Sequence, residues 1–158
     1  MKYRIGSGID FHQLIENKPF FLGGILIPFH KGALAHSDGD VLLHAICDAL
    51  LGAACLGDIG VHFPNSSKKF KNIDSKILLK ETYILIKNNG FLIQNIDSTI
   101  CLEEPKIQPF IKTMQQTIAE IVEINTEDIS IKATTTEQLG SIGRKEGIMA
   151  MATCLLSK

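Results

Sequence analysis

Asp10, His12 and His44 are the residues in this sequence best suited to hold a metal ion. Asp10 and His12 are two positions apart in a segment of alternating apolar residues. On a β-strand their side chains would therefore point to the same face, with Cα atoms about 6.6 Å apart. One carboxylate and two imidazoles form a three-ligand zinc set, which leaves the fourth position open as catalytic zinc sites do. The spacing predicts a catalytic zinc site that joins this strand to the segment carrying His44.

His44 belongs to a segment, residues 41–56, in which every other residue except Asp48 and Gly52 is apolar. Ser37 and Asp38 precede it as helix-capping residues, so we expect a helix that is buried on nearly all sides. A buried imidazole needs a partner, because an unpaired polar group costs roughly 2–7 kcal/mol. Asp48, one turn later, allows two interpretations. His44 is either a core histidine bonded to Asp48 or a zinc ligand whose ring Asp48 orients.

A second polar motif, Thr134-Thr135-Thr136-Glu137, follows a short apolar segment at residues 129–133. It fits a capping box, with threonine at the cap and glutamate three residues later. It also fits a phosphate-binding loop of hydroxyls and backbone N–H groups at the start of a short helix. In that loop Glu137 would supply a hard oxygen ligand for magnesium beside substrate phosphates. With the zinc set and with Lys106 after Pro105, this motif suggests diphosphate chemistry.

The elements expected to position these residues alternate along the chain. Apolar alternation predicts strands at residues 3–12, 91–102, 129–133 and 147–156. Gly23-Gly24 between two apolar runs predicts a hairpin. Helical periodicity predicts helices at residues 41–56, 75–89 and 107–122, and residues 56–67 form a long loop of the kind that is often functional. We predict an α/β (α+β) fold with a single mixed β-sheet and helices on one face.

The last predicted strand has apolar residues on both faces. Ile148 and Ala150 lie on one side, while Met149 and Met151 lie on the other. Three helices can cover only one face of a sheet, so we expect the second face to pack against another subunit. We expect residues 1–158 to form a single domain, since this length can bury a substantial core.

Composition excludes several classes of function. A formal net charge of −1 without a basic run gives no electrostatic footprint for nucleic acid or an anionic membrane. The four cysteines form no CxxC pair and three lie in apolar runs, which indicates buried free thiols of a reducing compartment. No apolar run approaches the roughly 18 residues of a membrane span, and no signal-type apolar segment precedes the first strand. We expect a cytoplasmic protein that binds neither nucleic acid nor membrane.

Several motifs, in the same order along the chain, resemble those of the 2-C-methyl-D-erythritol 2,4-cyclodiphosphate synthase family. They are residues 6–12, 35–44, 57–64 and 133–137, with Gly143-Arg144, and the resemblance covers essentially the whole chain. It implies a homotrimer of the non-mevalonate isoprenoid pathway, with active sites between neighbouring subunits. It also implies conversion of 4-diphosphocytidyl-2-C-methyl-D-erythritol 2-phosphate, a cytidine diphosphate substrate, into the cyclic diphosphate and CMP.

The resemblance implies roles for individual residues. Asp10, His12 and His44 match the zinc ligands, and Glu137 matches the ligand of a magnesium (or manganese) ion. His36 and Thr135 match residues that stabilise the transition state. The substrate-binding positions are Asp10, His12, His36, Ser37, Asp58, Ile59, Gly60, Phe63, Asn65, Ser67, Pro105, Lys106, Ala133, Thr134, Thr135, Thr136, Glu137 and Arg144. Catalysis would consist of positioning and charge neutralisation, without a protein nucleophile.

The sequence departs from the family pattern at three places. Asn65-Ser66-Ser67 stands where the family commonly has Asp-Thr-Asp, Ser141 replaces a common aromatic residue near the trimer axis, and Glu103-Glu104 replaces small or neutral residues. Two other functions would use the same ligands. One is a zinc-dependent phosphodiesterase or pyrophosphohydrolase that activates water at the open zinc position. The other is an oligomeric nucleotide-binding module with structural zinc, which the three-ligand count disfavours.

Overall fold

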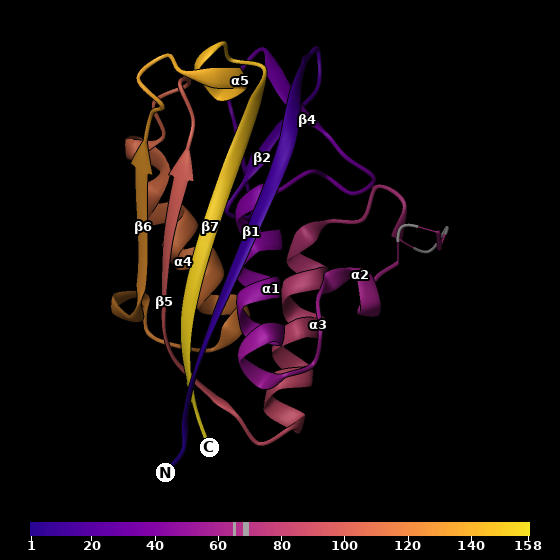
Figure 1. Cartoon of the computed structure of the whole chain (residues 1–158), viewed down its shortest axis with the longest axis vertical. Coiled ribbons are helices and arrows are strands. Elements are labelled where there is room, and N and C mark those ends of the chain that lie inside the picture. Colours follow the sequence, from indigo (N-terminus) through magenta and orange to yellow (C-terminus); the bar gives the residue numbers. More distant parts are fainter. Residues whose placement is uncertain (65, 68–69) are drawn as a thin grey trace.

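A five-stranded mixed β-sheet forms the frame of the molecule (Figure 1). The computed structural model describes residues 1–64, 66–67 and 70–158, so Asn65, a predicted substrate-binding residue, lies outside the described residues. The strands, in order across the sheet, are β4 (Lys31–Leu34), β1 (Tyr3–Glu16), β7 (Gly147–Ser157), β5 (Leu92–Cys101) and β6 (Ile129–Thr134). Strands β5 and β6 pair in parallel and the other neighbours are antiparallel. The predicted mixed sheet is confirmed.

The predicted hairpin also forms, but it stands apart from the main sheet. Strands β2 (Phe20–Leu22) and β3 (Ile25–Ile27) pair with each other in a separate two-stranded sheet. Gly23 and Gly24 make the turn with φ angles of +61° and +80°, a left-handed conformation that glycine adopts without a steric penalty. Their N–H groups donate to the carboxylate of Asp40, which fastens the hairpin to the start of the first helix.

The helices cover one face of the sheet, as predicted (Figure 1). The helices on this face are α1 (Val41–Ala54), α3 (Ser75–Asn88) and α4 (Ile111–Val122), with the short α2 (Ile59–His62) against α1. The short helix α5 (Gly140–Gly143) lies at the end of the sheet, next to the start of β7, and there are 3₁₀ turns η2 (Gln108–Phe110) and η3 (Thr126–Asp128). Helix α1 packs on β1 and β7, α3 packs on α1, and α4 packs on α3 and β6. Helix α4 begins at Ile111 rather than at residue 107, because a 3₁₀ turn containing Pro109 precedes it. Within the described part of the chain, every helix is too short or too polar to cross a membrane.

Helix α1 is buried along its length, and two glycines of β1 allow it to lie against the sheet. All of its residues except Asp48 and Gly52 are buried, as its composition predicts. A Cβ atom on Gly8 would lie 2.1 Å from the carbonyl oxygen of Ala45, so only glycine permits this approach. The helix is capped by Asp40, which accepts the N–H of Leu43 at 3.0 Å, rather than by the expected Ser37 or Asp38. The close packing brings the start of α1 against the strand that carries Asp10.

The four cysteines are free. Cys47, Cys101 and Cys154 are buried, as predicted, whereas Cys55 is exposed at the end of α1, so the prediction of a buried thiol is wrong for that residue. Burial raises the pKa of the Cys47 thiol to about 12, so this side chain is a neutral core residue at physiological pH.

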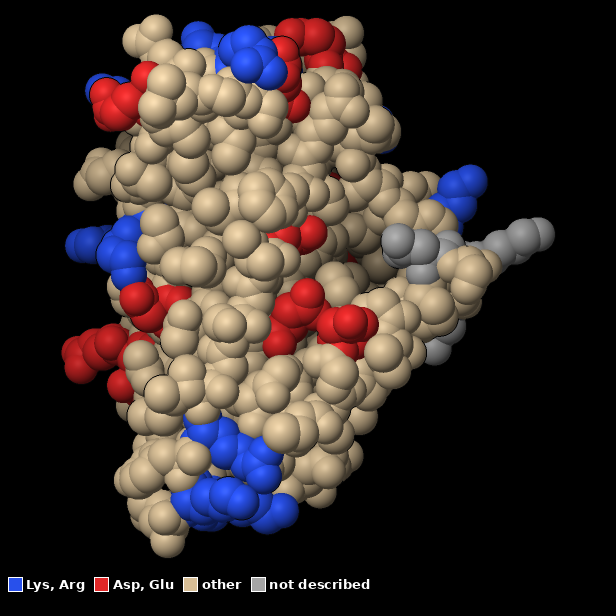
Figure 2. Space-filling model, in the orientation of Figure 1, with Lys and Arg blue, Asp and Glu red and all other residues tan. Residues whose placement is uncertain are grey.

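The opposite face of the sheet exposes large apolar side chains. Residues at odd positions of β1 point away from α1, and among them Ile5 is 75% exposed and Phe11 is 60% exposed. Met151 of β7, which pairs with Ile9 of β1, is 46% exposed on the same face. Figure 2 shows a broad uncharged area over these strands, beside a few Asp and Glu side chains near the middle of the view. One group of lysine and arginine lies near the end that carries both termini, and other basic side chains lie at the opposite end and along the margins. Such an extended apolar face is typical of a protein-protein interface.

Candidate active site

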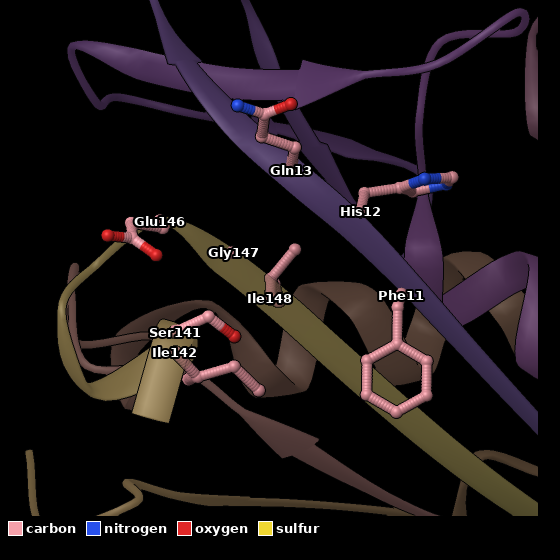
Figure 3. Close-up of a pocket in the computed structure, with 8 residues that line it drawn as sticks. All are labelled: Phe11, His12, Gln13, Ser141, Ile142, Glu146, Gly147 and Ile148. Atoms are coloured by element: carbon pink, nitrogen blue, oxygen red, sulfur yellow. The ribbon is translucent and has the colours of Figure 1, made fainter. Parts of the chain in front are cut away.

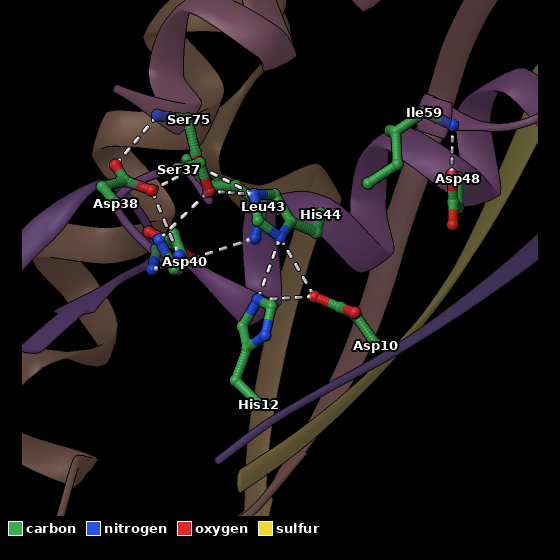
Figure 4. Close-up of polar contacts among 12 residues, drawn as sticks. Asp10, His12, Ser37, Asp38, Asp40, Leu43, His44, Asp48, Ile59 and Ser75 are labelled. Carbon is green, nitrogen blue, oxygen red and sulfur yellow. Dashed lines mark hydrogen bonds and ion pairs between the residues drawn. The ribbon is translucent and has the colours of Figure 1, made fainter. Parts of the chain in front are cut away.

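Asp10, His12 and His44 converge where strand β1 meets the first turn of helix α1 (Figure 4). Nε2 of His12 lies 3.2 Å from Nδ1 of His44, and Oδ2 of Asp10 lies 3.1 Å and 3.0 Å from these two nitrogens. Ligand atoms at about 2.0–2.1 Å from a tetrahedral zinc ion would be about 3.3 Å apart. The three donor atoms therefore have nearly the separations that zinc requires.

Burial and charge oppose each other in this cluster. Burial alone would raise the pKa of Asp10, but hydrogen bonds and the charges of His12 and His44 hold it well below its ordinary value. Burial alone would lower the pKa of His44, yet the hydrogen bond and the negative charge of Asp10 raise it above the ordinary 6.5. Asp10 is therefore a carboxylate at neutral pH, which is the form that binds a metal.

The outer ring nitrogen of His44 faces serine hydroxyls instead of Asp48 (Figure 4). Nε2 lies 2.9 Å from Oγ of Ser75 and 3.2 Å from Oγ of Ser37. Asp48 accepts the backbone N–H of Ile59 at 2.8 Å, because the start of α2 presents an N–H group that has no partner within its own helix. Both interpretations that paired Asp48 with His44 are therefore wrong.

A cavity of about 100 Å³ opens beside the three potential ligands, and we call it the zinc-side cavity. It is lined by the predicted zinc ligand His44, by the predicted substrate-binding residues His36, Ser37, Ile59, Gly60 and Phe63, and by Phe70, Ile73 and Leu78. Nε2 of His36 is buried and makes no hydrogen bond to the described residues. Asp58, also a predicted substrate-binding residue, caps α2 by accepting the N–H of Val61 at 3.0 Å. Ser67 is described but does not line this cavity.

A second cavity, of about 390 Å³, lies where the ends of β5 and β6 meet the segments that follow them. We call it the threonine-side cavity. It is lined by the predicted residues Pro105, Lys106, Ala133, Thr134, Thr135 and Glu137, and by Leu102, Glu103, Ile107 and Gln108. It has no lining residue in common with the zinc-side cavity. The predicted substrate-binding residues in these two cavities are therefore not brought together within one chain.

The loop that carries Glu137 is not a capping box. The next helix, α5, begins only at Gly140, and its N-cap Leu139 makes no side-chain cap bond. Instead, Oγ1 of Thr135 donates to Oε1 of Glu137 at 3.0 Å. The capping-box interpretation is therefore wrong, and the side chain of Glu137 stands exposed at the threonine-side cavity.

A carboxylate from the segment after β5 holds this loop in place. Oε1 of Glu103 accepts the N–H groups of Thr136 at 2.9 Å and Gln138 at 3.3 Å. Glu137 and Gln138 have φ angles of 53° and 65°, a left-handed conformation that costs energy in residues other than glycine. The hydrogen bonds to Glu103 offset that cost. The sequence offered only the unusual Glu103-Glu104 pair as a signal for this contact.

A third cavity, of about 360 Å³, lies between β1, β7 and α5 (Figure 3). Phe11 and Ser141 are among its lining residues. Arg144, a predicted substrate-binding residue, lies outside the zinc-side and threonine-side cavities. Its guanidinium pairs with both carboxylate oxygens of Glu146, at 2.9 and 3.0 Å, and Glu146 lines the third cavity. The cavity opens beside the apolar face of the sheet that Phe11 belongs to.

Comparison with known proteins matches residues 3–157 to the family described as the YgbB family. The chain belongs to the YgbB family. One relative, the 2-C-methyl-D-erythritol 2,4-cyclodiphosphate synthase of Bacteroides fragilis, is 58% identical over 158 residues, covering 100% of this chain and 99% of the relative. The enzyme of the same name from Prosthecochloris aestuarii is 55% identical over 155 residues, or 98% of this chain and 99% of that protein. The family resemblance predicted from the motifs is confirmed.

Solved structures of YgbB-type enzymes have the same fold. A 2C-methyl-D-erythritol-2,4-cyclodiphosphate synthase in its CDP-bound form superposes with a TM-score of 0.90 at 36% identity, over 98% of this chain and 100% of that chain. The bifunctional IspDF from Campylobacter jejuni gives a TM-score of 0.95 at 44% identity. The match covers 98% of this chain but only 42% of the bifunctional chain, which is the longer of the two.

Proposed function

We propose that the chain catalyses the cyclisation of 4-diphosphocytidyl-2-C-methyl-D-erythritol 2-phosphate to 2-C-methyl-D-erythritol 2,4-cyclodiphosphate, with release of CMP. In this proposal it is a phosphorus–oxygen lyase of the non-mevalonate pathway, and it is supported by full-length relatives that are named 2-C-methyl-D-erythritol 2,4-cyclodiphosphate synthase. The observation that carries the proposal is the convergence of Asp10, His12 and His44 beside a cavity lined by His36 and Ser37.

The donor sets favour two different metal ions. Two imidazole nitrogens and one carboxylate oxygen suit zinc, whereas the single exposed carboxylate of Glu137 suits magnesium or manganese held together with substrate phosphates. When bound, these ions supply polarisation of the β-phosphate and neutralisation of the charge that develops on the diphosphate. Asp10, His12 and His44 would hold the first ion, and Glu137 the second.

The chain's own residues bind and align the two reacting phosphates. Ser37 and the turn at Ile59-Gly60 hold the methylerythritol 2-phosphate, and the buried Nε2 of His36 is available to a phosphate oxygen because no described residue occupies it. Lys106, Thr134 and Thr135 line the side that takes the cytidine diphosphate. An oxygen of the 2-phosphate attacks the β-phosphorus, the bond from that phosphorus to the bridging oxygen breaks, and CMP leaves with the electron pair.

The two separate cavities fit an assembly in which each active site lies between subunits. The zinc-side and threonine-side cavities are separate in one chain, and the sheet face that includes Ile9, Phe11 and Met151 is apolar and exposed. A closed homotrimer of single-domain subunits would cover this face and bring the zinc-side cavity of one subunit to the threonine-side cavity of its neighbour.

Incorporation of oxygen from water distinguishes the cyclisation from zinc-dependent hydrolysis. The purified chain is incubated with the cytidyl substrate, zinc and magnesium in ¹⁸O-water, and the products are examined by ³¹P NMR. A cyclic diphosphate without solvent oxygen supports the proposal, since the attacking oxygen comes from the substrate. Labelled open-chain phosphates would show a hydrolase instead. Asp10→Ala serves as the matched control for activity that does not depend on the site.

A further inference from the structure

Ser75 lies between His44 and Asp38 in the interior of the protein. It is the first residue of α3 and is completely buried. Its Oγ atom lies 2.9 Å from Nε2 of His44, and its hydroxyl donates a short hydrogen bond to Oδ1 of Asp38 (Figure 4). The backbone N–H of Ser75 donates to Oδ2 of the same carboxylate at 2.9 Å. Both oxygens of Asp38 are thus engaged by one residue.

The hydroxyl proton of Ser75 determines whether Nε2 of His44 carries a proton. A serine hydroxyl has a single proton to donate, and a carboxylate only accepts. The Ser75 proton is directed to Asp38, so the lone pairs of Oγ face Nε2 of His44. That contact is a hydrogen bond only if Nε2 carries the proton. Nδ1 faces Asp10 and His12, and in the metal-free protein it donates its own proton to the carboxylate of Asp10. A metal ion would replace that proton, whereas the proton on Nε2 would remain.

We propose that Ser75, held by Asp38, is a positioning residue that keeps the His44 proton on Nε2 and thereby presents Nδ1 to the metal ion. The inference rests on the proposed zinc site. Ser37 is the alternative partner of Nε2, but its contact is longer, at 3.2 Å, and its Oγ already accepts the N–H of Gly39. A hydrogen bond to the outer nitrogen of a ligating histidine fixes both its tautomer and its ring orientation.

Backbone hydrogen bonds also join the turn at residues 36–38 to the segment that precedes α3. The N–H of Asp38 donates to the carbonyl of Ile73 at 3.1 Å, and the N–H of Asn72 donates to the carbonyl of His36 at 2.8 Å. Ser75 therefore reaches Asp38 only when the start of α3 is docked on the turn at residues 36–38. The position of the hydrogen on the His44 ring therefore depends on the packing of α3, because Ser75 lies 31 positions from His44 in the sequence.

The test compares Ser75→Ala with the parent in two measurements. Chelator competition gives the zinc dissociation constant, and long-range ¹H–¹⁵N NMR of the zinc-loaded chain shows which nitrogen of His44 carries hydrogen. We expect hydrogen on Nε2 in the parent and a loss of zinc affinity of about 10- to 100-fold in Ser75→Ala, as for other outer partners of ligating histidines. Hydrogen on Nδ1 in the parent, or an affinity within twofold in the variant, would overturn the inference.

Two further variants separate this role from general packing. Ser98→Ala truncates another buried serine, whose hydroxyl donates to the carbonyl of Ser130 at 3.0 Å in the sheet, and zinc affinity should stay within twofold of the parent. Asp38→Asn should weaken zinc binding and, combined with Ser75→Ala, should add little further loss, because both act through one contact. Additive losses would contradict the proposal that Asp38 acts through Ser75. If Ser75→Ala does not fold, zinc affinity is measured for Asp38→Asn alone.

The same data distinguish this inference from the proposed metal site. If the parent binds no zinc, or if His44→Ala binds zinc as the parent does, the zinc site itself is wrong. If the parent binds zinc through His44 and Ser75→Ala binds it equally well, only the role of Ser75 is wrong.

Discussion

Oδ2 of Asp10 lies 3.0 Å from Nδ1 of His44, although 34 positions separate the two residues. The contact depends on Gly6 and Gly8, since a Cβ atom on either would lie about 2 Å from a carbonyl oxygen of α1. A strand and a buried helix thus hold the two side chains. Ligands carried by regular elements are positioned more precisely than ligands carried by loops.

Removal of either ligand should lower zinc affinity and turnover together. His44→Ala and Asp10→Ala should lower zinc affinity by about 100-fold or more, because the outer partners of such ligands alone contribute 10- to 100-fold. Asp48→Asn, one turn along α1, is the matched control and should keep its zinc, since Asp48 bonds Ile59 instead. Metal analysis and circular dichroism check these outcomes. Full zinc occupancy in both ligand variants would refute the assignment.

Zinc binding should weaken as the pH falls through the raised pKa of His44. Zinc binds the neutral imidazole, and the hydrogen bond to Asp10 places the pKa of His44 in the metal-free protein above 6.5 in spite of its burial. Protons therefore compete at pH values where an ordinary histidine is already neutral. Asp10 does not contribute in this range, because its pKa is lowered. Apparent zinc dissociation constants measured between about pH 6 and 9 should fall steadily up to the raised pKa, and a constant value above pH 6.5 would contradict this.

Much of the fold and the metal cluster could be predicted because their signals are local. Asp10 and His12 are two positions apart on a strand, and an almost uniformly apolar helix with one histidine has to place that histidine against polar partners. The Gly23-Gly24 turn likewise follows from the conformation that glycine allows. In each case neighbouring residues specify the local structure, and the sheet then brings the elements together.

Hydrogen bonds between residues of distant segments could not be predicted in the same way. Ser75 begins an ordinary helix in the sequence, and only the docking of α3 places its hydroxyl against His44. The capping-box prediction failed for a similar reason. Glu103, 34 residues before Glu137, binds the N–H groups on either side of that residue and favours a left-handed loop over a helix start.

The purified chain should sediment as a trimer at micromolar concentration. Burial of apolar surface contributes about 25 cal/mol per Å², and Ile9, which pairs with Met151 on the apolar sheet face, is 53% exposed. Ile9→Asp should shift the protein toward monomer, because the assembled form would bury an unpaired charge. Ile77→Asp is the control, since Ile77 is 51% exposed on α3, in the helical layer. A parent that is monomeric throughout would contradict the proposed assembly.

Glu103→Ala should raise the magnesium concentration needed for half-maximal turnover by about fivefold, without loss of zinc. The variant removes the acceptor of the Thr136 and Gln138 N–H groups, and one net hydrogen bond is worth about 1 kcal/mol. Glu104→Ala is the matched control, because the ion pair of Glu104 with Lys145, at 2.8 Å, is exposed and contributes little to stability. Titration of turnover with magnesium gives the comparison. Equal magnesium dependence in both variants would show that Glu103 does not position the loop.

Glu137→Gln should melt within a few degrees of the parent yet lose most of its turnover at ordinary magnesium concentrations. Among the described residues the exposed side chain accepts the Thr135 hydroxyl alone, a contact that the glutamine carbonyl can keep. About 1 kcal/mol corresponds to roughly 2–4 °C at this chain length. A magnesium ligand needs the negative charge, so raising magnesium should restore part of the activity. Glu120→Gln, an exposed substitution on α4, should change neither property. If Glu137→Gln keeps full activity at limiting magnesium, substrate phosphates and water alone must hold the second ion.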